Sequence, residues 1–578
     1  MAAIMTAVDD DKPGRPAIPP EPVVAEAARA EAVQPDPSAP TGILRSTALA
    51  PSMGTYLAAN VWIRLLNFAR VFVLTRIMLK PQYGLLSCIL IVTNVLTPLC
   101  SLGLNEAIAR YVPQYENMGS LARFARRSLV LLVIVVVVSV CGILANANWL
   151  GGWFYATILD DAATRAAFSA EAPSLARVTG LIIALSAIYF YLMAVIKGLR
   201  MFRALSWLEL SHSLLFLGGC LIVAMTGQLS AFTIASLYAA SLAIPCVWFG
   251  MRLLPALTSW NSQQGLERLS GLEKKLIRFS IWTTLAGVTW QALLYYPAWH
   301  LKKVHGDDVM AVFSGARQIC NIVFVGAVAM STVVMATITR TWETEGRVAA
   351  EKQLSLAFRT VGLGLLLLCG AISLTKHWVI RLLHADYAAG AEIMPLHLLF
   401  FLFGGYLAFL PAHFHLRERT RQMLWPWIAG VAISVILAIY LVGPTTGFVA
   451  GAEWAQTLDR LLGGVFVVGF LDSSGLAPAA WCGVVGMTAA VGVCVLLVTR
   501  EHYRLDRGSV IVLVSAFVVA ARPWLVATAC LLLLALALRG ALIFTADERR
   551  KVFRYIAAVP MHVPAVRKLL PGVWRDHG

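Results

Sequence analysis

The chain has 578 residues, of which 59% are hydrophobic and only 13% are charged, and its mean hydropathy is +0.74. Soluble domains carry about 25% charged residues, so this composition excludes an ordinary soluble protein and indicates a membrane protein with many spans. The net charge of +16 would suit a nucleic-acid-binding protein, but the basic residues fall in short loops between apolar segments, where the positive-inside rule accounts for them.

The chain begins with a polar segment and continues with a long series of apolar segments. Residues 1–48 are rich in Ala, Pro and Glu and predict a disordered tail. Apolar segments long enough to cross a bilayer follow and predict about 14 transmembrane helices. Their ranges are 55–79, 84–107, 128–150, 178–197, 205–226, 230–253, 277–301, 309–335, 356–379, 390–412, 424–443, 475–499, 508–521 and 523–544.

The first two spans are separated by a short turn. Pro81 cannot continue a helix and Gly84 tolerates a tight turn, so Lys80 to Gly84 is predicted to end one helix and start the next. The second span is free of charge from Leu85 to Leu104, and we expect Arg110-Tyr111-Val112-Pro113 to open the following inner loop.

The distribution of Lys and Arg sets the orientation. If the N-terminus is cytoplasmic, the inner connections hold more than twice as many basic residues as the outer ones. An even number of spans then places the basic C-terminal tail inside as well. The count depends on Ala521-Arg522-Pro523, which is the only break in the last apolar run and leaves either two helices or one kinked helix.

Polar residues inside the first span are candidates for function, because a charge within a span costs at least about 2.5–3.5 kcal/mol. Asn60, Arg64 and Asn67 share one helix face, and Arg70 lies about 120° from Arg64. Because arginine binds phosphate oxygens with paired hydrogen bonds, we predict that Arg64, Asn67 and Arg70 contact a phosphate-bearing substrate. The alternative is that a carboxylate of a neighbouring helix neutralises both arginines.

The seventh and eighth spans carry further candidates for substrate binding. Gln291 shares a face with Tyr295, and a polar-aromatic face of this kind binds sugars, although aromatic residues near a helix end also form interface belts. Arg317 and Asn321 are i, i+4 neighbours about nine residues into the eighth span. They are predicted to contact substrate, and the alternative is that they hydrogen-bond a neighbouring helix.

Carboxylates are scarce in the spans. Glu106 lies near the inner end of the second span, and Glu209 and His212 form an i, i+3 pair in the fifth. These three residues are the candidates for relaying a proton or binding a coupling cation. The alternative is that the two carboxylates pair with Arg110 or Arg203.

Several kinds of chemistry are excluded by motifs that the sequence lacks. It contains no GxxxxGK[ST], HExxH or GxSxG motif, and its ten cysteines lie in apolar runs without a CxxC pair. We therefore expect no ATP hydrolysis, no metal site, no disulfide framework, no cofactor, no catalytic residue and no nucleic-acid partner.

Two basic or polar turns recur six spans apart, which suggests a parallel repeat of six helices. The sequence KPQYG follows the first span and KKVHG follows the seventh, while KGLRMFRALSW precedes the fifth span and HLRERTRQMLW precedes the eleventh. Under this repeat the eighth span corresponds to the second, and a cationic cavity would receive residues from both halves of the chain.

Short phrases give the chain a family resemblance. They are Leu74-Thr75-Arg76, Pro81-Gln82-Tyr83-Gly84, Leu102-Gly103-Leu104, Lys197-Gly198-Leu199-Arg200 and Arg417-Glu418-Arg419. With the helix count and the basic inner loops, they make residues 50–550 resemble the polysaccharide-export and oligosaccharide-lipid flippases of the multidrug/oligosaccharidyl-lipid/polysaccharide exporter superfamily. The long N-terminal extension and the outer loop at 444–474 depart from the family pattern.

The resemblance implies an all-α polytopic membrane protein, with two six-helix bundles around a central cavity and two additional helices. The expected divisions are a tail at 1–48, bundles at 49–254 and 277–499 joined by a cytoplasmic linker at 255–276, two helices within 500–545 and a basic tail at 546–578. It also implies that the protein flips undecaprenyl-pyrophosphate-linked oligosaccharide across the bacterial inner membrane by alternating access without ATP. Lipid-linked oligosaccharide and membrane lipids are the expected partners, and a polysaccharide polymerase and a chain-length regulator are candidates.

Three alternatives to this function stay open. A flippase for a lipid-linked peptidoglycan precursor shares the architecture. A drug exporter of the same superfamily would need an acidic, aromatic cavity, whereas the spans hold arginines and few carboxylates. A membrane polymerase or ligase of glycans would need sizeable outer loops with functional residues.

Overall fold

The computed structural model describes most of the membrane-spanning part of the chain. The described residues are 80–148, 172–227, 230–259, 271–305, 307–381, 388–442, 475–501, 505–539 and 542–552, with individual residues between 56 and 78 and residues 457, 466 and 503. They form helices and one isolated bridge between Phe466 and Ala521. The expected tail at 1–48 lies outside the described residues, as does the basic tail beyond residue 552.

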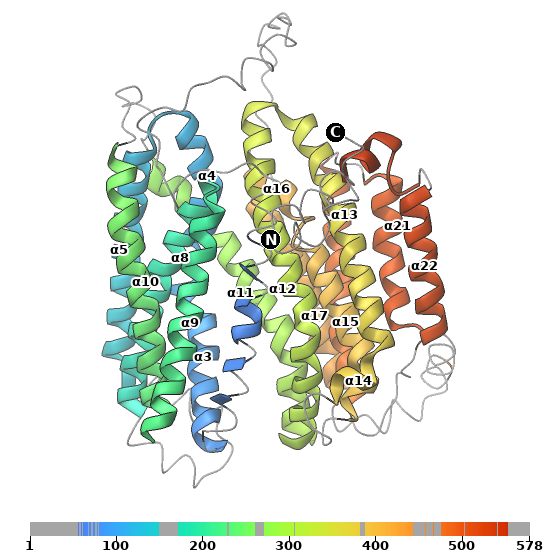
Figure 1. Cartoon of the computed structure of the whole chain (residues 1–578), viewed down its shortest axis with the longest axis horizontal. Coiled ribbons are helices and arrows are strands. Elements are labelled where there is room, and N and C mark those ends of the chain that lie inside the picture. The colour runs from blue at the N-terminus through green and yellow to red at the C-terminus, as the bar shows by residue number, and fades with distance from the viewer. Residues whose placement is uncertain are drawn as a thin grey trace, which may run out of the picture. The chain divides into compact units, whose positions relative to one another are not determined.

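The first half of the chain forms one group of helices (Figure 1). The described residues between Tyr56 and Leu74 are helical and come before it. The group consists of α3 (Lys80–Cys100), α4 (Leu104–Asn117), α5 (Leu121–Ala145), α8 (Ala172–Gly198), α9 (Phe202–Thr226) and α10 (Ala231–Ser259). Within it, α8 packs against α3, α4, α5 and α10 and therefore lies at its centre.

The second half forms another group. Its longer helices are α11 (Leu272–His305), α12 (Asp307–Thr344), α13 (Arg347–Leu374), α15 (Gly390–Tyr406), α17 (Leu424–Leu441), α20 (Leu476–Arg500) and α22 (Pro523–Arg539). Its shorter elements are α14 (Lys376–Ile380), α16 (Ala412–Leu416), η4 (Thr420–Met423), α21 (Arg507–Ser515) and η5 (Ala516–Ala520). Every described residue of α15 is buried except Glu392, because α15 packs against α12, α13 and α20.

The described residues bury two separate hydrophobic cores, one in each group. We call the two groups the first and second bundle. Helices α11 and α12 belong to both: Leu276 and Phe279 of α11 and Val333 of α12 lie in the first core, whereas Leu293 and Phe313 lie in the second. These two long helices therefore connect the bundles, and they pack against α4 of the first bundle.

The turn after the second span differs from the prediction. Helix α3 ends at Cys100, and α4 continues the chain as a helix through Arg110 and Pro113, where a loop was expected. Gly103 has a φ of +57° in this turn, a conformation that favours glycine, and its Cα lies so close to α11 that an added Cβ would overlap Thr284 Oγ1. Close packing against α11, which local sequence does not report, thus sets the position of this turn.

The last apolar run forms two helices. Helix α21 and the 3₁₀ turn η5 end at Ala520, Ala521 is extended with a ψ of 173°, and α22 begins at Pro523. The proline explains the break, because it lacks the N–H that would continue the helix and suits a first-turn position.

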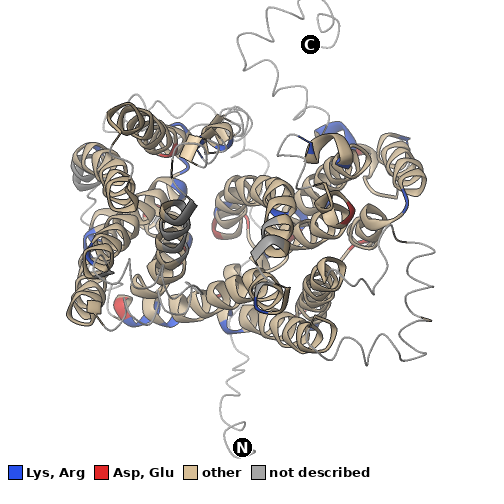
Figure 2. Cartoon of the chain, turned by 90° about the horizontal axis from the view of Figure 1, so that it is seen from below, with Lys and Arg blue, Asp and Glu red and all other residues tan. Residues whose placement is uncertain are grey.

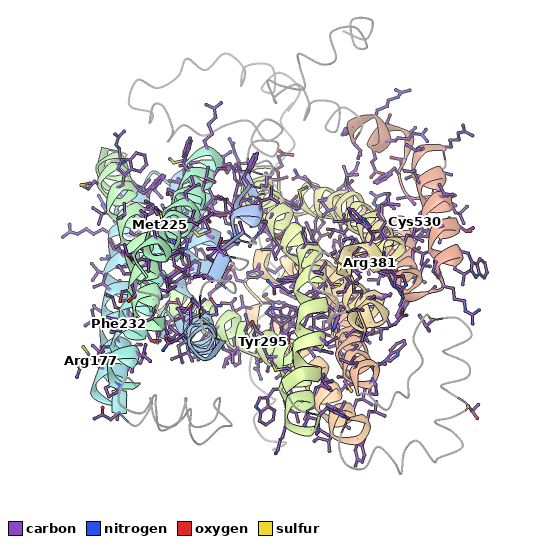
Figure 3. The ribbon with its side chains drawn as sticks, turned by 60° about the horizontal axis from the view of Figure 1, so that its bottom comes forward. Arg177, Met225, Phe232, Tyr295, Arg381 and Cys530 are labelled. Atoms are coloured by element: carbon purple, nitrogen blue, oxygen red, sulfur yellow. The ribbon has the colours of Figure 1, made fainter. Side chains whose placement is uncertain are left out.

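The described helices have the dimensions and surface of membrane spans. Eight are long and apolar enough to cross a bilayer, and Gly390–Tyr406, Arg507–Ala520 and Pro523–Arg539 are shorter apolar helices. Few charged residues interrupt the ribbons (Figure 2), and large apolar side chains such as Met225 and Phe232 project from the first bundle (Figure 3). The all-α membrane fold is confirmed, and the described helices are consistent with about 14 spans.

Candidate functional site

A polar cluster joins the first span to α9 inside the first bundle. The hydroxyl of Tyr56 donates a hydrogen bond to Glu209 Oε1 over 3.2 Å, and Asn60 Nδ2 donates to the carbonyl of Tyr56. The charge of Arg64 interacts with the Glu209 carboxylate and with Tyr56. The structure therefore places Glu209 within electrostatic range of Arg64, as in the alternative interpretation of the sequence, without an ion pair between them among the described contacts.

A second group of rings surrounds His212, one turn along α9. His212 Nδ1 lies 3.2 Å from the hydroxyl of Ser241, and the rings of Tyr189 and Tyr238 lie 5.5 Å and 5.3 Å away. The guanidinium of Arg70 lies 5.1 Å from the ring centre of Phe216 and interacts electrostatically with His212. Glu209 interacts with Arg64 and His212 with Arg70, and Tyr189 interacts with both Glu209 and His212.

Glu106 lies at the interface between the bundles. It is exposed in the first turn of α4, and its charge interacts with His415 of α16. The expected pairing of the span carboxylates with Arg110 or Arg203 is not seen among the described contacts, since Glu209 interacts with Arg64 and Arg110 binds Glu343.

Arg317 is enclosed by aromatic rings in the second bundle. Its guanidinium lies 5.1 Å from the ring centre of Phe400 and 5.8 Å from those of Phe313 and Phe401. The residue lies about 15 Å along α12 from its first residue, at 1.5 Å per residue, and within Val312–Thr344, the stretch of α12 that is long and apolar enough to cross a bilayer. Rings from α12 and α15 supply cation–π attraction in place of water.

No carboxylate among the described residues offsets the charge of Arg317. Within the described part of the chain, Arg317 makes no ion pair and no hydrogen bond, and the groups that interact electrostatically with it are Tyr295, Cys320 and His397. Part of its surface stays accessible. A guanidinium carries five N–H donors, and leaving them unpaired at this depth is costly. The side chain is therefore suited to bind an oxygen-rich anion.

The aromatic wall extends from Arg317 to α11. Trp290 lies 6.0 Å from Phe400, 4.8 Å from Phe324 and 5.2 Å from Trp427. Gln291, beside Trp290, and Asn321, one turn beyond Arg317, are partly exposed and make no hydrogen bond with a described residue. Asn67 in the first span is also partly exposed, and its amide likewise has no described hydrogen-bond partner.

The two arginine clusters are separate in this conformation. Arg64 and Arg70 interact with residues of the first bundle, whereas Arg317 interacts with rings of the second, and no described contact joins the two sets. The predicted common cavity thus stays a prediction. The sequence indicated Arg317 but not its rings, because Phe400 and Phe401 lie far away in an apolar run that could equally face lipid.

Arg110 forms the main polar contact between the bundles, and sequence analysis missed this role. Its Nη1 donates to Glu343 Oε1 of α12 over 2.9 Å, and its Nε and Nη2 donate to the carbonyls of His415 and Leu416 at 3.4 Å and 3.3 Å. Near it, Lys275 Nζ lies 3.2 Å from Glu418 Oε1, with both side chains 38% exposed. We call the contacts of Arg110 with Glu343 and α16 the inter-bundle joint.

The segment that receives Arg110 is held to the second bundle by Glu501. Arg417, Arg419 and Gln422 donate hydrogen bonds to the Glu501 carboxylate. Burial acts to raise the pKa of Glu501, but the hydrogen bonds from Gln422 and Arg419 and the charges of both arginines outweigh it and leave this pKa below its ordinary value. Arg110 therefore joins the first bundle to a segment that the second bundle fixes in place.

His413 lies beside this segment. Its side chain is buried, and its Nδ1 lies 3.6 Å from Glu351 Oε1, beyond the reach of a good hydrogen bond. Burial lowers the pKa of His413 to about 4, so the ring is neutral at physiological pH. Among the described residues, no three His, Cys, Asp or Glu side chains gather as a metal site would require.

The fold resembles that of known transporters. An outward-facing multidrug resistance MATE family transporter of the MOP superfamily is 16% identical, the match covers 80% of this chain and 98% of that one, and the TM-score is 0.61. A MOP superfamily transporter from Pyrococcus furiosus, described with a binding pocket of reverse polarity, is 13% identical over 79% and 99% of the two chains, with a TM-score of 0.60. A point mutant of a MATE protein is 15% identical over 80% and 98%, with a TM-score of 0.63.

The sequence comparison agrees with this fold. No curated protein matches the sequence. The family described as polysaccharide biosynthesis protein matches residues 49–342, which is about half of the chain and includes the first bundle, α11 and most of α12. The protein is therefore a multi-pass membrane protein that belongs to the polysaccharide biosynthesis protein family, and its fold is similar to that of transporters of the MOP superfamily.

Proposed function

We propose that the protein flips undecaprenyl-pyrophosphate-linked oligosaccharide across the bacterial inner membrane for the synthesis of a surface polysaccharide. The observation that carries this proposal is the guanidinium of Arg317, which is enclosed by aromatic rings and has no anionic partner among the described residues. A pyrophosphate offers oxygens that arginine binds bidentately, and the surrounding rings offer faces on which sugar rings stack.

The electrostatics favour an anionic substrate over a cationic drug. A site for a cation would place carboxylates against the aromatic wall, whereas the charged side chain that packs against Phe400 is that of Arg317. In the first bundle, the Arg64 charge is offset by Glu209. We infer that Arg64, Asn67 and Arg70 of the first bundle and Gln291, Arg317 and Asn321 of the second bind the substrate as the bundles rearrange.

Transport proceeds without ATP by alternating access, and the protein acts as a transporter and not as an enzyme. The bundles move relative to one another by breaking and remaking the inter-bundle joint at Arg110, while the prenyl tail stays in lipid. Both termini lie in the cytoplasm, as the excess of basic residues in the inner connections favours. A polysaccharide polymerase and a chain-length regulator are the partners that would use the flipped product.

Glu209 is the strongest of the three coupling candidates, ahead of Glu106 and His212. Its carboxylate accepts a hydrogen bond from Tyr56 and offsets Arg64. When a pyrophosphate binds Arg64, the carboxylate loses its counter-charge, and uptake of a proton by Glu209 would then remove the repulsion between the two anions. We expect Glu209→Gln to leave substrate binding intact and to make transport insensitive to the proton gradient.

The test of the proposed function is transport in proteoliposomes with a fluorescent lipid-linked oligosaccharide, read as the fraction of glycan accessible to a glycosidase added outside. Removing a hydrogen bond to a charged group costs about 1.5–3 kcal/mol, so Arg317→Ala should lower the transport rate about 10- to 100-fold. Arg317→Lys, which keeps the charge without the bidentate geometry, should lose less. Arg381, an exposed arginine of the same bundle that makes no described ion pair, is the matched control as Arg381→Ala.

The outcomes separate the competing functions. Equal rates for wild type and Arg317→Ala would refute the role of this side chain. Transport of a lipid-linked peptidoglycan precursor in place of the oligosaccharide would reassign the substrate, and cation-dependent efflux of a dye would indicate a drug exporter. Glycan elongation by the purified protein would indicate a polymerase.

A further inference from the structure

A groove opens on the surface of the first bundle, away from the residues proposed to bind the substrate. It has a volume of about 610 Å³ and lies between the first turns of α5 and the start of α11. Its lining consists of three arginines, three aliphatic residues and one carboxylate, namely Arg123, Arg126, Arg127, Val130, Leu131, Ile134 and Glu273.

The residues of α5 in this groove form one amphipathic helix face. Their spacing of three and four residues places them on the same side of α5, with the arginines nearest its N-terminal end. The face passes from charged to apolar within about 12 Å, the rise of eight residues from Arg126 to Ile134. Val130 is 52% exposed and Ile134 is 56% exposed, and α5 is the least buried of the described candidate spans. The apolar half of the groove therefore faces the hydrocarbon of the bilayer.

Two of the arginines in the groove have no carboxylate partner among the described residues. Arg123 and Arg126 make no ion pair with any residue in the described part of the chain, and neither does Glu273, the only carboxylate in the lining. Arg123 and Arg126 outnumber the single carboxylate of the lining, so the groove attracts an anion. Guanidinium groups at the level of the lipid headgroups suit a phosphate, and the apolar face next to them suits acyl chains, so together they fit an anionic lipid.

We propose that this groove binds an anionic phospholipid of the bilayer. The headgroup phosphate accepts hydrogen bonds from Arg123 and Arg126, and the acyl chains lie along Val130 and Ile134. The apolar half of the groove excludes a free phosphate ion as the natural occupant, because such an ion would leave that half uncovered.

Phospholipid is favoured over the prenyl-linked substrate by the position of the groove. It is formed by the lipid-facing side of α5, whereas the residues proposed to bind the substrate lie on the first span, α11 and α12. Anionic phospholipid is also the abundant anionic amphiphile at the inner surface of a bacterial membrane, where the proposed orientation places this end of α5. The inference does not depend on which glycan the protein carries.

The experiment measures lipid binding to the purified full-length protein in detergent by native mass spectrometry. The probes are dioleoyl-phosphatidylglycerol, dioleoyl-phosphatidylcholine, inorganic phosphate and farnesyl pyrophosphate, a short prenyl pyrophosphate. The variant is Arg123→Gln with Arg126→Gln. The matched control is Arg203→Gln, which removes an exposed arginine from the N-terminal end of α9 in the same bundle.

Each arginine near a membrane surface contributes about fivefold to the binding of an anionic lipid, so the double variant should bind phosphatidylglycerol about 30-fold more weakly. Arg203→Gln should stay within about twofold of wild type. If the double variant does not fold, Arg126→Gln alone, at an exposed position, should weaken binding about fivefold.

Two results would overturn the proposal. One is a lack of dependence on charge: wild type and the double variant bind phosphatidylglycerol with equal affinity, or wild type binds phosphatidylcholine as tightly as phosphatidylglycerol. The other is farnesyl pyrophosphate, or inorganic phosphate alone, displacing phosphatidylglycerol from wild type, which would assign the groove to the prenyl carrier or to a free anion.

Discussion

The inter-bundle joint predicts that Arg110→Ala loosens the contact between the bundles. Arg110 is 6% exposed, donates to Glu343 of α12 and also donates to two carbonyls of α16. Alanine removes all three hydrogen bonds and leaves the Glu343 carboxylate without its partner. The state in which the bundles are joined at this end is therefore destabilised relative to the state in which they separate.

The size of this effect follows from the burial of the pair. Truncating one partner of a fully buried ion pair costs about 3–5 kcal/mol. Glu343 is 23% exposed, so water solvates part of its charge once Arg110 is gone, and about 2–3 kcal/mol is the expected cost. This cost corresponds to a shift of roughly 30- to 100-fold in the equilibrium between joined and separated bundles.

Hydrogen–deuterium exchange of the full-length protein in nanodiscs measures this shift directly. Peptides that cover α4 and α16 should exchange roughly 30- to 100-fold faster in Arg110→Ala, because their amides are protected by the joined state. Peptides that cover α21 and α22, at the far side of the second bundle, should exchange as in wild type. The matched control is Lys275→Ala, which breaks an ion pair with Glu418 at the same end whose members are each 38% exposed.

Such an exposed pair contributes about 1 kcal/mol or less, so exchange in the control should rise by no more than about fivefold. Wild-type exchange rates in α4 and α16 of the Arg110→Ala variant would refute the reasoning. Equal effects of Arg110→Ala and Lys275→Ala would also refute it, because the buried ion pair would then stabilise the joined state no more than the exposed pair does.

Three further predictions concern stability and are checked by thermal unfolding or proteolysis of the purified protein. Gly103→Ala should lower the Tm, because a φ of +57° costs about 1–2 kcal/mol for alanine and the added Cβ would overlap the hydroxyl of Thr284 on α11. Gly142→Ala is the control and should not lower the Tm, since an added Cβ has no neighbour within 4 Å there. Arg359→Ala should lower the free energy of unfolding by about 3 kcal/mol or more, because the buried guanidinium binds Glu548 at 2.7 Å. Residues 542–552 should then be cleaved by protease, and a variant that resists cleavage there as wild type does would contradict this prediction. Burial acts to raise the pKa of Glu548, but hydrogen bonds with Arg359 and Thr545 leave it below its ordinary 4.5. The stability that this carboxylate contributes is therefore present above about pH 4.5 and lost as the pH falls through the lowered pKa, so Glu548→Gln should show a smaller fall in Tm on acidification than wild type.

Much of the fold could be predicted from composition and periodicity. Apolar length and the distribution of basic residues indicate the spans, since a bilayer imposes both constraints on each segment separately. The break between α21 and η5 on one side and α22 on the other follows from Pro523, a local constraint. The position of the turn at Gly103 could not be predicted from local sequence, because it depends on how closely α11 approaches.

The candidate site shows the same division. Arg64, Arg317 and Glu209 were identifiable because a polar residue inside a span is costly wherever it lies. Their partners were not, since Tyr56 lies in the first span and Glu209 in the fifth, and the rings around Arg317 come from two helices. The proposed proton relay between Glu209 and His212 rested on helical spacing and stays a prediction, and the tertiary structure adds Tyr189, which interacts with both side chains.

A helical membrane protein with arginines in its spans could be recognised without coordinates, because hydrophobic length and charge are properties of each segment. The partners of each arginine became apparent from the packing of the helices. Arg64 interacts with a carboxylate of α9, Arg110 joins the bundles through Glu343, and Arg317 lies among rings without a described anionic partner. The charge of a side chain follows from its residue type, but the free energy of that charge depends on the groups that surround it.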